Sequence, residues 1–199
     1  MSKKNHASMD IHQQLGDIPA KSQTILDATQ KALGFVPNMY NNMAINPALL
    51  DAYSYAYQSF RQNAGFTSVE QEVVFLSAAY ANNCEYCMAA HSFVGDNMTK
   101  VPTEVTDAIR AGIDVPDEKL NALADFTRKM TKNRGTVKQE TLDNFLNAGY
   151  TPSHAQGVIA GIAVKTMSNY SNHLTSPVLD DVFAGRVWSK PTKVKNTPQ

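Results

Sequence analysis

The segment 82–93 reads NNCEYCMAAHSF and holds both cysteines of the 199-residue chain, Cys84 and Cys87, three positions apart. His91 follows the second cysteine by four positions. On a helix, which turns about 100° per residue, these three side chains fall within roughly 60° of one face. Because side chains at i and i+4 meet on a helix, His91 is placed to act as the base for Cys87. The spacing therefore predicts a redox-active thiol pair.

The residues before the pair predict the start of a helix. Asn82 or Asn83 is a favourable N-cap, and either one would place Cys84 in the first turn. The free amides of that turn and the helix dipole stabilise a thiolate. This argument favours Cys84 as the nucleophile, whereas the position of His91 favours Cys87.

Three other interpretations of the pair are weaker. A zinc site needs four ligands, but the segment supplies three and the sequence has no second CxxC or HxxxH cluster. Haem attachment requires a histidine directly after the second cysteine, where Met88 stands. Free cysteines are often inert residues of a buried helix face, but burial alone does not require the histidine and the cap residue.

Glu72 is the other residue whose position indicates chemistry. Its helical neighbours are all apolar, and they are Val69, Phe75, Leu76 and Ala79. A carboxylate on such a stripe needs a partner or a raised pKa. A turn at 81–83 would fold two helices back on each other and bring Glu72 level with His91, which it could then orient.

Composition excludes several classes of partner. The chain has 18 Lys and Arg and 18 Asp and Glu, so its net charge of zero gives no indication of binding to nucleic acid or anionic lipid. The N-terminus lacks the apolar core of a signal peptide, and no window approaches a membrane-spanning length. We therefore expect a cytoplasmic protein without membrane contact. The polar segment 1–20 and the basic, proline-containing segment 189–199 are expected to be flexible ends around one helical domain at 21–188.

Helix signals recur along this domain, while alternating strand-like patterns are almost absent. Cap residues precede four apolar-periodic runs, and they are Asn46, Thr67, Thr136 and Thr151. Thr67 with Glu70 and Thr136 with Gln139 have the spacing of a capping box. The sequence thus predicts an all-α fold, an antiparallel helical bundle with short turns.

Two glycines, Gly157 and Gly161, lie four positions apart in the last of these helices. They would let another helix approach closely, within the chain or across a subunit contact. Core packing within the chain is the simpler of these two explanations.

Glu72, Cys84, Cys87 and His91 together form the pattern E-x11-C-x-x-C-x3-H. This pattern resembles the active-site motif of alkyl hydroperoxidase D and its relatives in the carboxymuconolactone decarboxylase family. The flanking segments LGFVPNMYNNMAINPALLDAY and VEQEVVFLSAAYANNCEYCMAAH resemble the peroxidase-related branch of that family. The resemblance implies a helical bundle of the alkyl hydroperoxidase D-like type.

The resemblance also implies an antioxidant function, that of a thiol-dependent peroxidase or disulfide oxidoreductase without haem, flavin or metal. In the family, the cysteine matching Cys87 attacks a hydroperoxide and becomes a sulfenic acid. The cysteine matching Cys84 then closes a disulfide, while the residues matching His91 and Glu72 relay protons. The implied partners are a dithiol reductant protein of thioredoxin-like or lipoyl type and further copies of the chain in a homo-oligomer, a trimer or a multiple of one.

The proton requirement of peroxide cleavage agrees with this order. A base within reach can hand a proton to the leaving oxygen, whereas a helix dipole only stabilises charge, so we predict that Cys87 attacks and Cys84 resolves. The chain departs from alkyl hydroperoxidase D in having Tyr86 between the cysteines, where that protein has a histidine. The alternative hypothesis is a non-enzymatic helical oligomeric module whose CxxC pair senses redox state or binds zinc weakly.

Overall fold

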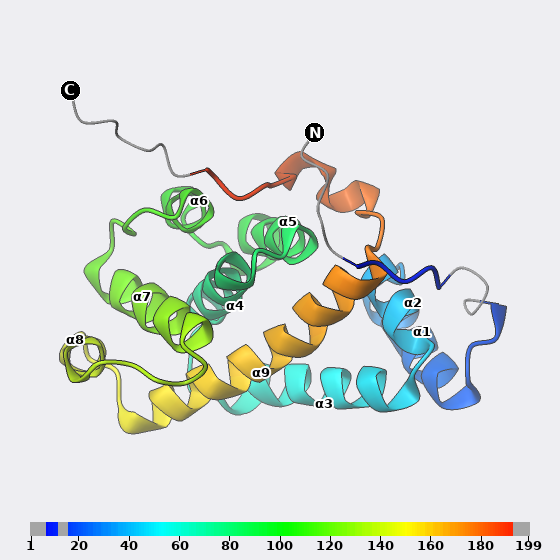
Figure 1. The fold of residues 1–199 in the computed structure, drawn as a ribbon, viewed down its shortest axis with the longest axis horizontal. Helices are drawn as coiled ribbons and strands as arrows, with labels where there is room; N and C mark the ends of the chain where they lie inside the picture. Colours follow the sequence, from blue (N-terminus) through cyan, green and yellow to red (C-terminus); the bar gives the residue numbers. More distant parts are fainter. Residues whose placement is uncertain (1–6, 12–15, 193–199) are drawn as a thin grey trace.

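The computed structural model describes residues 7–11 and 16–192, which form an all-α structure (Figure 1). This confirms the predicted antiparallel helical bundle. Its helices are α1 (Ala20–Leu33), α2 (Asn38–Ala44), α3 (Pro47–Asn63), α4 (Ser68–Asn82), α5 (Glu85–Val94), the π-helical turn η2 (Gly95–Thr99), α6 (Thr103–Ala111), α7 (Glu118–Lys132), α8 (Gln139–Asn147), α9 (Pro152–Thr175) and the 3-10 helix η3 (Asp181–Arg186).

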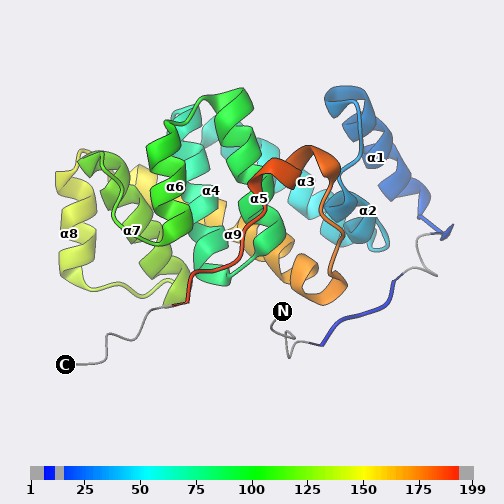
Figure 2. The ribbon, with the colours of Figure 1, turned by 90° about the horizontal axis from the view of Figure 1, so that it is seen from above.

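Helix α4 forms the centre of the bundle. It packs against α5, α6, α7 and α9, as Figures 1 and 2 show from two directions. Ten consecutive residues, 70–79, are buried, so this helix is enclosed on nearly every side. A polar side chain in that stretch must find its partners inside the protein.

Three of the predicted helix starts are confirmed. The side chain of Asn46 accepts from two amides of α3, and Thr67 and Thr151 each form a capping box at the start of α4 and α9. The prediction for Thr136 is wrong. Its backbone amide donates to Asn133 O in the turn after α7, so α8 begins later, with Lys138 at the N-cap position and no side-chain cap.

The two glycines of α9 pack inside the chain. A Cβ atom on Gly157 would lie 2.9 Å from the carbonyl oxygen of Ala64, and one on Gly161 would lie 2.6 Å from Val74 Cγ1. Of the two explanations, core packing is therefore confirmed. These glycines no longer support a subunit contact.

Segments near both ends of the described chain lie against the bundle. The backbone amide of Met9 donates to Leu174 O at 2.7 Å, and Ile11 is buried. Towards the C-terminus, the chain after η3 crosses α5 to reach α6, where Trp188 Nε1 donates to Arg110 O at 2.8 Å (Figure 2). The ends expected to be flexible, 1–20 and 189–199, lie partly outside the described residues. None of the described helices is both long and apolar enough to cross a membrane.

Candidate active site

The bend between α4 and α5 positions the two cysteines. Asn83 adopts the left-handed conformation, with φ of 56°, and ends α4, while the amide of Cys84 still donates to Ala79 O at 3.0 Å. Cys84 is therefore itself the N-cap of α5, and Cys87 lies in the first turn. The predicted N-cap at Asn82 or Asn83 is wrong because the turn uses Asn83 to end the preceding helix.

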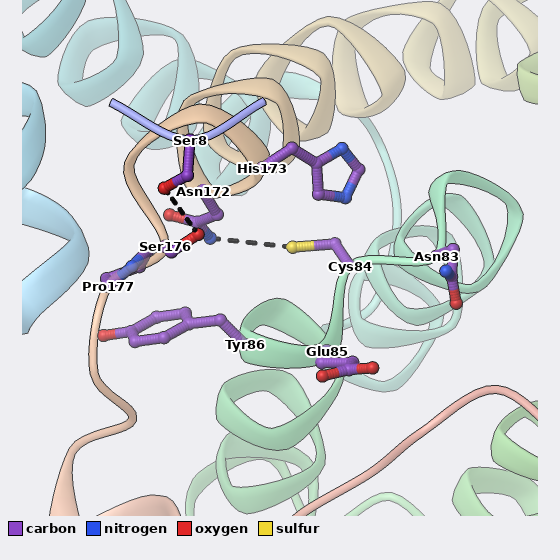
Figure 3. A pocket seen from close by; sticks show the side chains of 9 residues that line it. All are labelled: Ser8, Asn83, Cys84, Glu85, Tyr86, Asn172, His173, Ser176 and Pro177. Carbon is purple, nitrogen blue, oxygen red and sulfur yellow. Dashed lines mark hydrogen bonds between the residues drawn. The ribbon is translucent and has the colours of Figure 1, made fainter. Parts of the chain in front are cut away.

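Both thiols are free and only 1% exposed. Helix α9 covers them with polar side chains. Nδ2 of Asn172 lies 3.6 Å from Cys84 Sγ (Figure 3) and 3.3 Å from Cys87 Sγ, so one amide group contacts both sulfur atoms. Ser168 Oγ lies 3.8 Å from Cys87 Sγ. The pair is thus held in a buried but polar environment.

The two thiols differ in acidity. The hydrogen bond to Cys87 and burial raise the pKa of Cys84 well above its ordinary value. Burial alone would also raise the pKa of Cys87, but the hydrogen bond from Cys84 and the positive charge of Lys165 lower it well below its ordinary value. One cysteine is thereby prepared as a thiolate and the other as its protonated partner.

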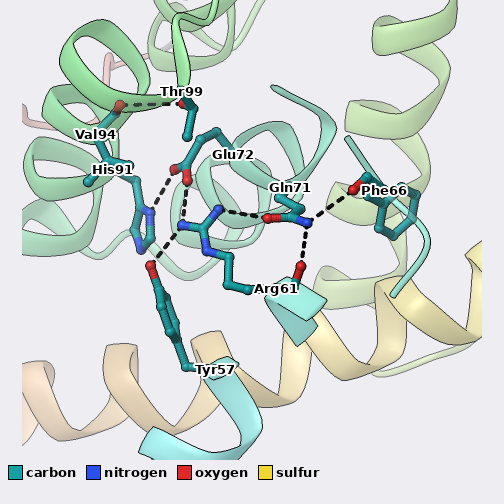
Figure 4. Close-up of polar contacts among 8 residues, drawn as sticks. All are labelled: Tyr57, Arg61, Phe66, Gln71, Glu72, His91, Val94 and Thr99. Carbon is teal, nitrogen blue, oxygen red and sulfur yellow. Dashed lines mark hydrogen bonds and ion pairs between the residues drawn. The ribbon is translucent and has the colours of Figure 1, made fainter. Parts of the chain in front are cut away.

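The predicted contact between Glu72 and His91 is present. Because α5 folds back along α4, Nδ1 of His91 lies 2.8 Å from Glu72 Oε2 (Figure 4). Glu72 is fully buried and His91 is 7% exposed. The carboxylate therefore fixes the orientation of the ring that follows Cys87 by one helical turn.

Glu72 has a second partner on α3. Arg61 Nη2 lies 2.5 Å from Glu72 Oε1 and donates to the hydroxyl of Tyr57 at 2.8 Å. Gln71 accepts from Arg61 Nη1 at 3.1 Å and returns its own amide to Arg61 O and Phe66 O (Figure 4). These contacts anchor the carboxylate that orients His91.

The protonation states follow from the charges around them. Burial would raise the pKa of Glu72, but His91 and Arg61 together lower it, so this carboxylate is ionised. Burial and the charge of Lys165 lower the pKa of His91 despite the neighbouring Glu72. A neutral imidazole beside an ionised carboxylate carries its proton on Nδ1. Nε2 of His91 is then free to accept a proton.

Tyr86 lies between the cysteines in sequence, but its hydroxyl points elsewhere. It donates to Asp180, and it accepts from the amide of Met39 at 3.4 Å. Burial and the hydrogen bond to Asp180 raise its pKa, so Tyr86 stays neutral. The hydroxyl therefore holds α5 to the neighbouring segments that carry Asp180 and Met39.

Two cavities border the site on different sides. One, of about 520 Å³, reaches His91 and Arg61 and has a largely apolar wall with aromatic rings from Tyr40, Tyr53, Tyr57, Phe93 and Phe183. The other, of about 260 Å³, is more polar and reaches Cys84, Asn172 and Ser8 (Figure 3). Tyr86 lines both cavities. The site is therefore approached from an apolar side at the histidine and from a polar side at Cys84.

Sequence reasoning found Glu72, Cys84, Cys87 and His91 but missed their partners on α3 and α9. Arg61 carried no separate signal, because an arginine on a helix is usually exposed. The signal that was available lies in α9, where polar residues occur at intervals of three or four on a helix otherwise rich in small apolar residues, and they are Lys165, Ser168, Asn169 and Asn172. All four are buried.

Metal binding was among the interpretations weighed from the sequence. Over residues 7–11 and 16–192, no group of three or more histidine, cysteine, aspartate or glutamate side chains is arranged to hold a metal ion. The chemistry that the described residues offer is that of a thiol pair with an oriented imidazole.

Comparison with known proteins identifies the fold. The sequence matches no protein-family profile and no curated protein. An uncharacterized peroxidase-related protein from Ralstonia eutropha JMP134, described as an alkylhydroperoxidase AhpD core, superposes with a TM-score of 0.75 and 24% identity over 88% of this chain and 94% of that chain. An uncharacterized peroxidase-related protein from Silicibacter sp. TM1040 superposes with a TM-score of 0.74 and 18% identity over 94% of this chain and 98% of that chain.

A third similar structure is that of the debrominase Bmp8 in complex with 2,3,4-tribromopyrrole, with a TM-score of 0.69 and 15% identity over 93% of this chain and 96% of that chain. These likenesses confirm the fold that the resemblance implied. The chain has the alkylhydroperoxidase AhpD core fold of the peroxidase-related proteins.

Proposed function

We propose that the protein is a thiol-dependent peroxidase or disulfide oxidoreductase that reduces hydroperoxides through Cys84 and Cys87. The observation that carries the proposal is geometric: the Asn172 amide contacts both free thiols, and Glu72 holds His91 one helical turn after Cys87. The pKa values of the two thiols shift in opposite directions, down at Cys87 and up at Cys84, which agrees with this arrangement. A thiolate is the attacking form of cysteine, and a protonated thiol is the form that condenses with a sulfenic acid.

In the first step, the Cys87 thiolate attacks the terminal oxygen of the hydroperoxide. The O–O bond breaks and the products are a sulfenate on Cys87 and the alcohol: Cys–S⁻ + ROOH gives Cys–SO⁻ + ROH. The balance requires one proton to move from the terminal oxygen to the leaving oxygen. Neutral His91, held by Glu72 at Nδ1, is the group whose free Nε2 can carry it.

In the second step, the sulfenate on Cys87 takes up a proton, and the thiol of Cys84 condenses with the resulting sulfenic acid. The reaction Cys84–SH + Cys87–SOH gives the disulfide and one molecule of water. A dithiol partner protein, of thioredoxin-like or lipoyl type, then reduces the disulfide by thiol exchange. The polar cavity gives this partner an approach to Cys84, the cysteine that borders it.

The apolar cavity suggests the kind of peroxide. Its aromatic wall and its volume of about 520 Å³ suit a hydroperoxide with an apolar carbon skeleton, whose O–O group would meet His91. We further propose a cytoplasmic homo-oligomer, a trimer or a multiple of one, with a single domain at 21–188.

The test is turnover of a panel of peroxides, from hydrogen peroxide to bulky organic hydroperoxides, with a dithiol reductant in excess. We expect repeated turnover with a preference for the organic substrates, and its loss in Cys87→Ser. Consumption of a single equivalent of peroxide, without further turnover under any reductant, would favour the redox-sensing module instead.

A second candidate is thiol-dependent dehalogenation of an aromatic compound. The observation that favours it is the same aromatic wall beside His91, together with the likeness to the debrominase Bmp8 in complex with a tribromopyrrole. Incubation with 2,3,4-tribromopyrrole and a dithiol, followed by measurement of bromide, separates the two functions.

A further inference from the structure

A buried cation lies beside the thiol pair. Lys165 on α9 is 0% exposed, and among the described residues its Nζ has no hydrogen-bond partner. Its Nζ lies over the ring of Phe75, 5.4 Å from the ring centroid. A buried ammonium group is unfavourable unless a negative charge faces it. The structure therefore calls for an anion near Lys165.

The buried carboxylate of the site is already paired. Both oxygens of Glu72 are engaged, Oε1 with Arg61 and Oε2 with His91. The described ion pairs include none to Lys165. The negative charge that balances Lys165 must come from another group.

Few ionisable groups remain around this region. On α3, burial raises the pKa of Tyr53 and of Tyr57, so both hydroxyls stay neutral. On α5, the pKa of His91 is lowered and that of Cys84 is raised, so these groups are neutral as well. The remaining group that can become an anion is Cys87.

The spacing on α9 places Lys165 on the helix face that lies over this sulfur. Lys165, Ser168 and Asn172 lie at i, i+3 and i+7, which places them on one face of the helix. The second and third of them contact the sulfur of Cys87, at 3.8 and 3.3 Å. Lys165 continues the same buried face by one turn, and its charge acts on Cys87.

We propose that Lys165 is the counter-ion of the Cys87 thiolate. The buried cluster then contains two cations, Arg61 and Lys165, and two anions, Glu72 and Cys87. With a neutral thiol at Cys87, the same cluster would carry one unbalanced positive charge. Lys165 thus sets the charge state of the sulfur, while Asn172 and Ser168 supply dipoles around it.

The counter-ion also affects the disulfide. In the reaction of the protein dithiol with glutathione disulfide, which yields the protein disulfide and two glutathione molecules, the thiolate disappears and Lys165 loses its partner. Lys165 therefore favours the reduced form, as any group does that stabilises the thiolate of a redox pair. The Cys84–Cys87 disulfide is then easily reduced by an incoming dithiol.

The first experiment measures thiolate absorbance as a function of pH in Cys84→Ser protein, where Cys87 is the single cysteine. Lys165→Met removes the charge with little change in volume, Lys165→Arg keeps the charge, and Lys138→Met is a matched control at an exposed lysine. We expect the midpoint of the Cys87 titration to rise by about one pH unit or more in Lys165→Met, since loss of one opposite charge shifts a pKa by about that much. An unchanged titration in that variant would overturn the proposal.

The second experiment measures melting temperatures, so that the proposal can be tested even if Lys165→Met folds poorly. The proposal predicts that Cys87→Ser, which leaves Lys165 without its anion, lowers the melting temperature, and that Cys87→Ser/Lys165→Met recovers it. Additive losses in the double variant would contradict the pairing. The equilibrium of the two-cysteine protein with glutathione should shift about tenfold towards the disulfide in Lys165→Met and stay unchanged in Lys138→Met.

The catalytic role of this counter-ion rests on the proposed peroxidase function. The two experiments themselves do not depend on that function. Neither experiment contains a peroxide. A normal thiolate titration without peroxide turnover would reject the function and keep the ion pair. Peroxide turnover together with an unchanged thiolate titration in Lys165→Met would keep the proposed function and reject the ion pair.

Discussion

Replacing Glu72 by Gln tests whether the buried carboxylate orients the histidine. The substitution keeps the size of the side chain and removes its charge. An amide group can donate to Nδ1 of His91, which would move the ring proton to Nε2 and turn the proton acceptor into a donor. It also leaves Arg61 without its buried anion.

The two effects have different magnitudes. Loss of the acid–base function is expected to slow peroxide reduction by about 10² to 10⁴-fold, or about 3–5 kcal/mol in the barrier. Breaking a buried ion pair costs about 3–5 kcal/mol of stability. Because the Arg61 side chain is 18% exposed, we expect a value near the lower end, about 3 kcal/mol.

The double variant Arg61→Met/Glu72→Gln separates these effects. It removes both charges, so it should regain most of the stability while its peroxidase rate stays low. Unfolding in denaturant and the steady-state rate are measured on the parent, both single variants and the double variant. A stable double variant with the parent's activity would refute the orienting role and leave Glu72 as a structural residue.

Four further predictions concern the thiols, the pH response and the core. A dimedone-type probe should label Cys87 in Cys84→Ser protein after one equivalent of peroxide, with almost no label in Cys87→Ser protein; the reverse pattern would make Cys84 the nucleophile. Oxidation of the parent should join Cys84 to Cys87 within one chain, and peptide mapping that finds only inter-chain bridges would contradict this. The free energy of unfolding should fall as the pH drops below 6.5 and again below 4.5, because the lowered pKa values of His91 and Glu72 mean that the unfolded chain binds more protons there; a flat profile in denaturant titrations would argue against both shifts. Gly161→Ala should lower the melting temperature, since the new Cβ would lie 2.6 Å from Val74 Cγ1 and overpacking costs about 1–3 kcal/mol, more than the gain in helix propensity; an unchanged melting temperature would show that α9 can shift.

Local signals predicted much of the fold correctly. The caps at Asn46, Thr67 and Thr151 depend on side chains that satisfy amides two or three residues away, so the sequence contains the whole interaction. The cap predicted at Thr136 was wrong because the turn after α7 extends through this residue, so that the end of one helix competes with the start of the next. The N-cap predicted at Asn83 was wrong for the same reason, since asparagine is favourable both as an N-cap and as a left-handed residue at a helix end.

The part of the site that was predicted from the sequence lies on α4, the bend after it and α5. Cys87 and His91 lie on α5 with Cys84 at its N-cap, and Glu72 lies on α4, where its apolar neighbours indicate burial and the turn brings it to His91. Their assignment as site residues stays a prediction until activity is measured.

The sequence by itself determined the all-α class, the starts of α3, α4 and α9, the bend at 81–83 and the four chemical groups around it, because periodicity, caps and spacing act over a few residues. Only the tertiary structure decided the charge balance. Arg61 comes from α3 and Lys165 from α9, elements that meet α4 and α5 in space without any fixed sequence spacing. The physical reason is that a buried charge is determined by every group packed around it, and those groups are assembled only when the bundle closes.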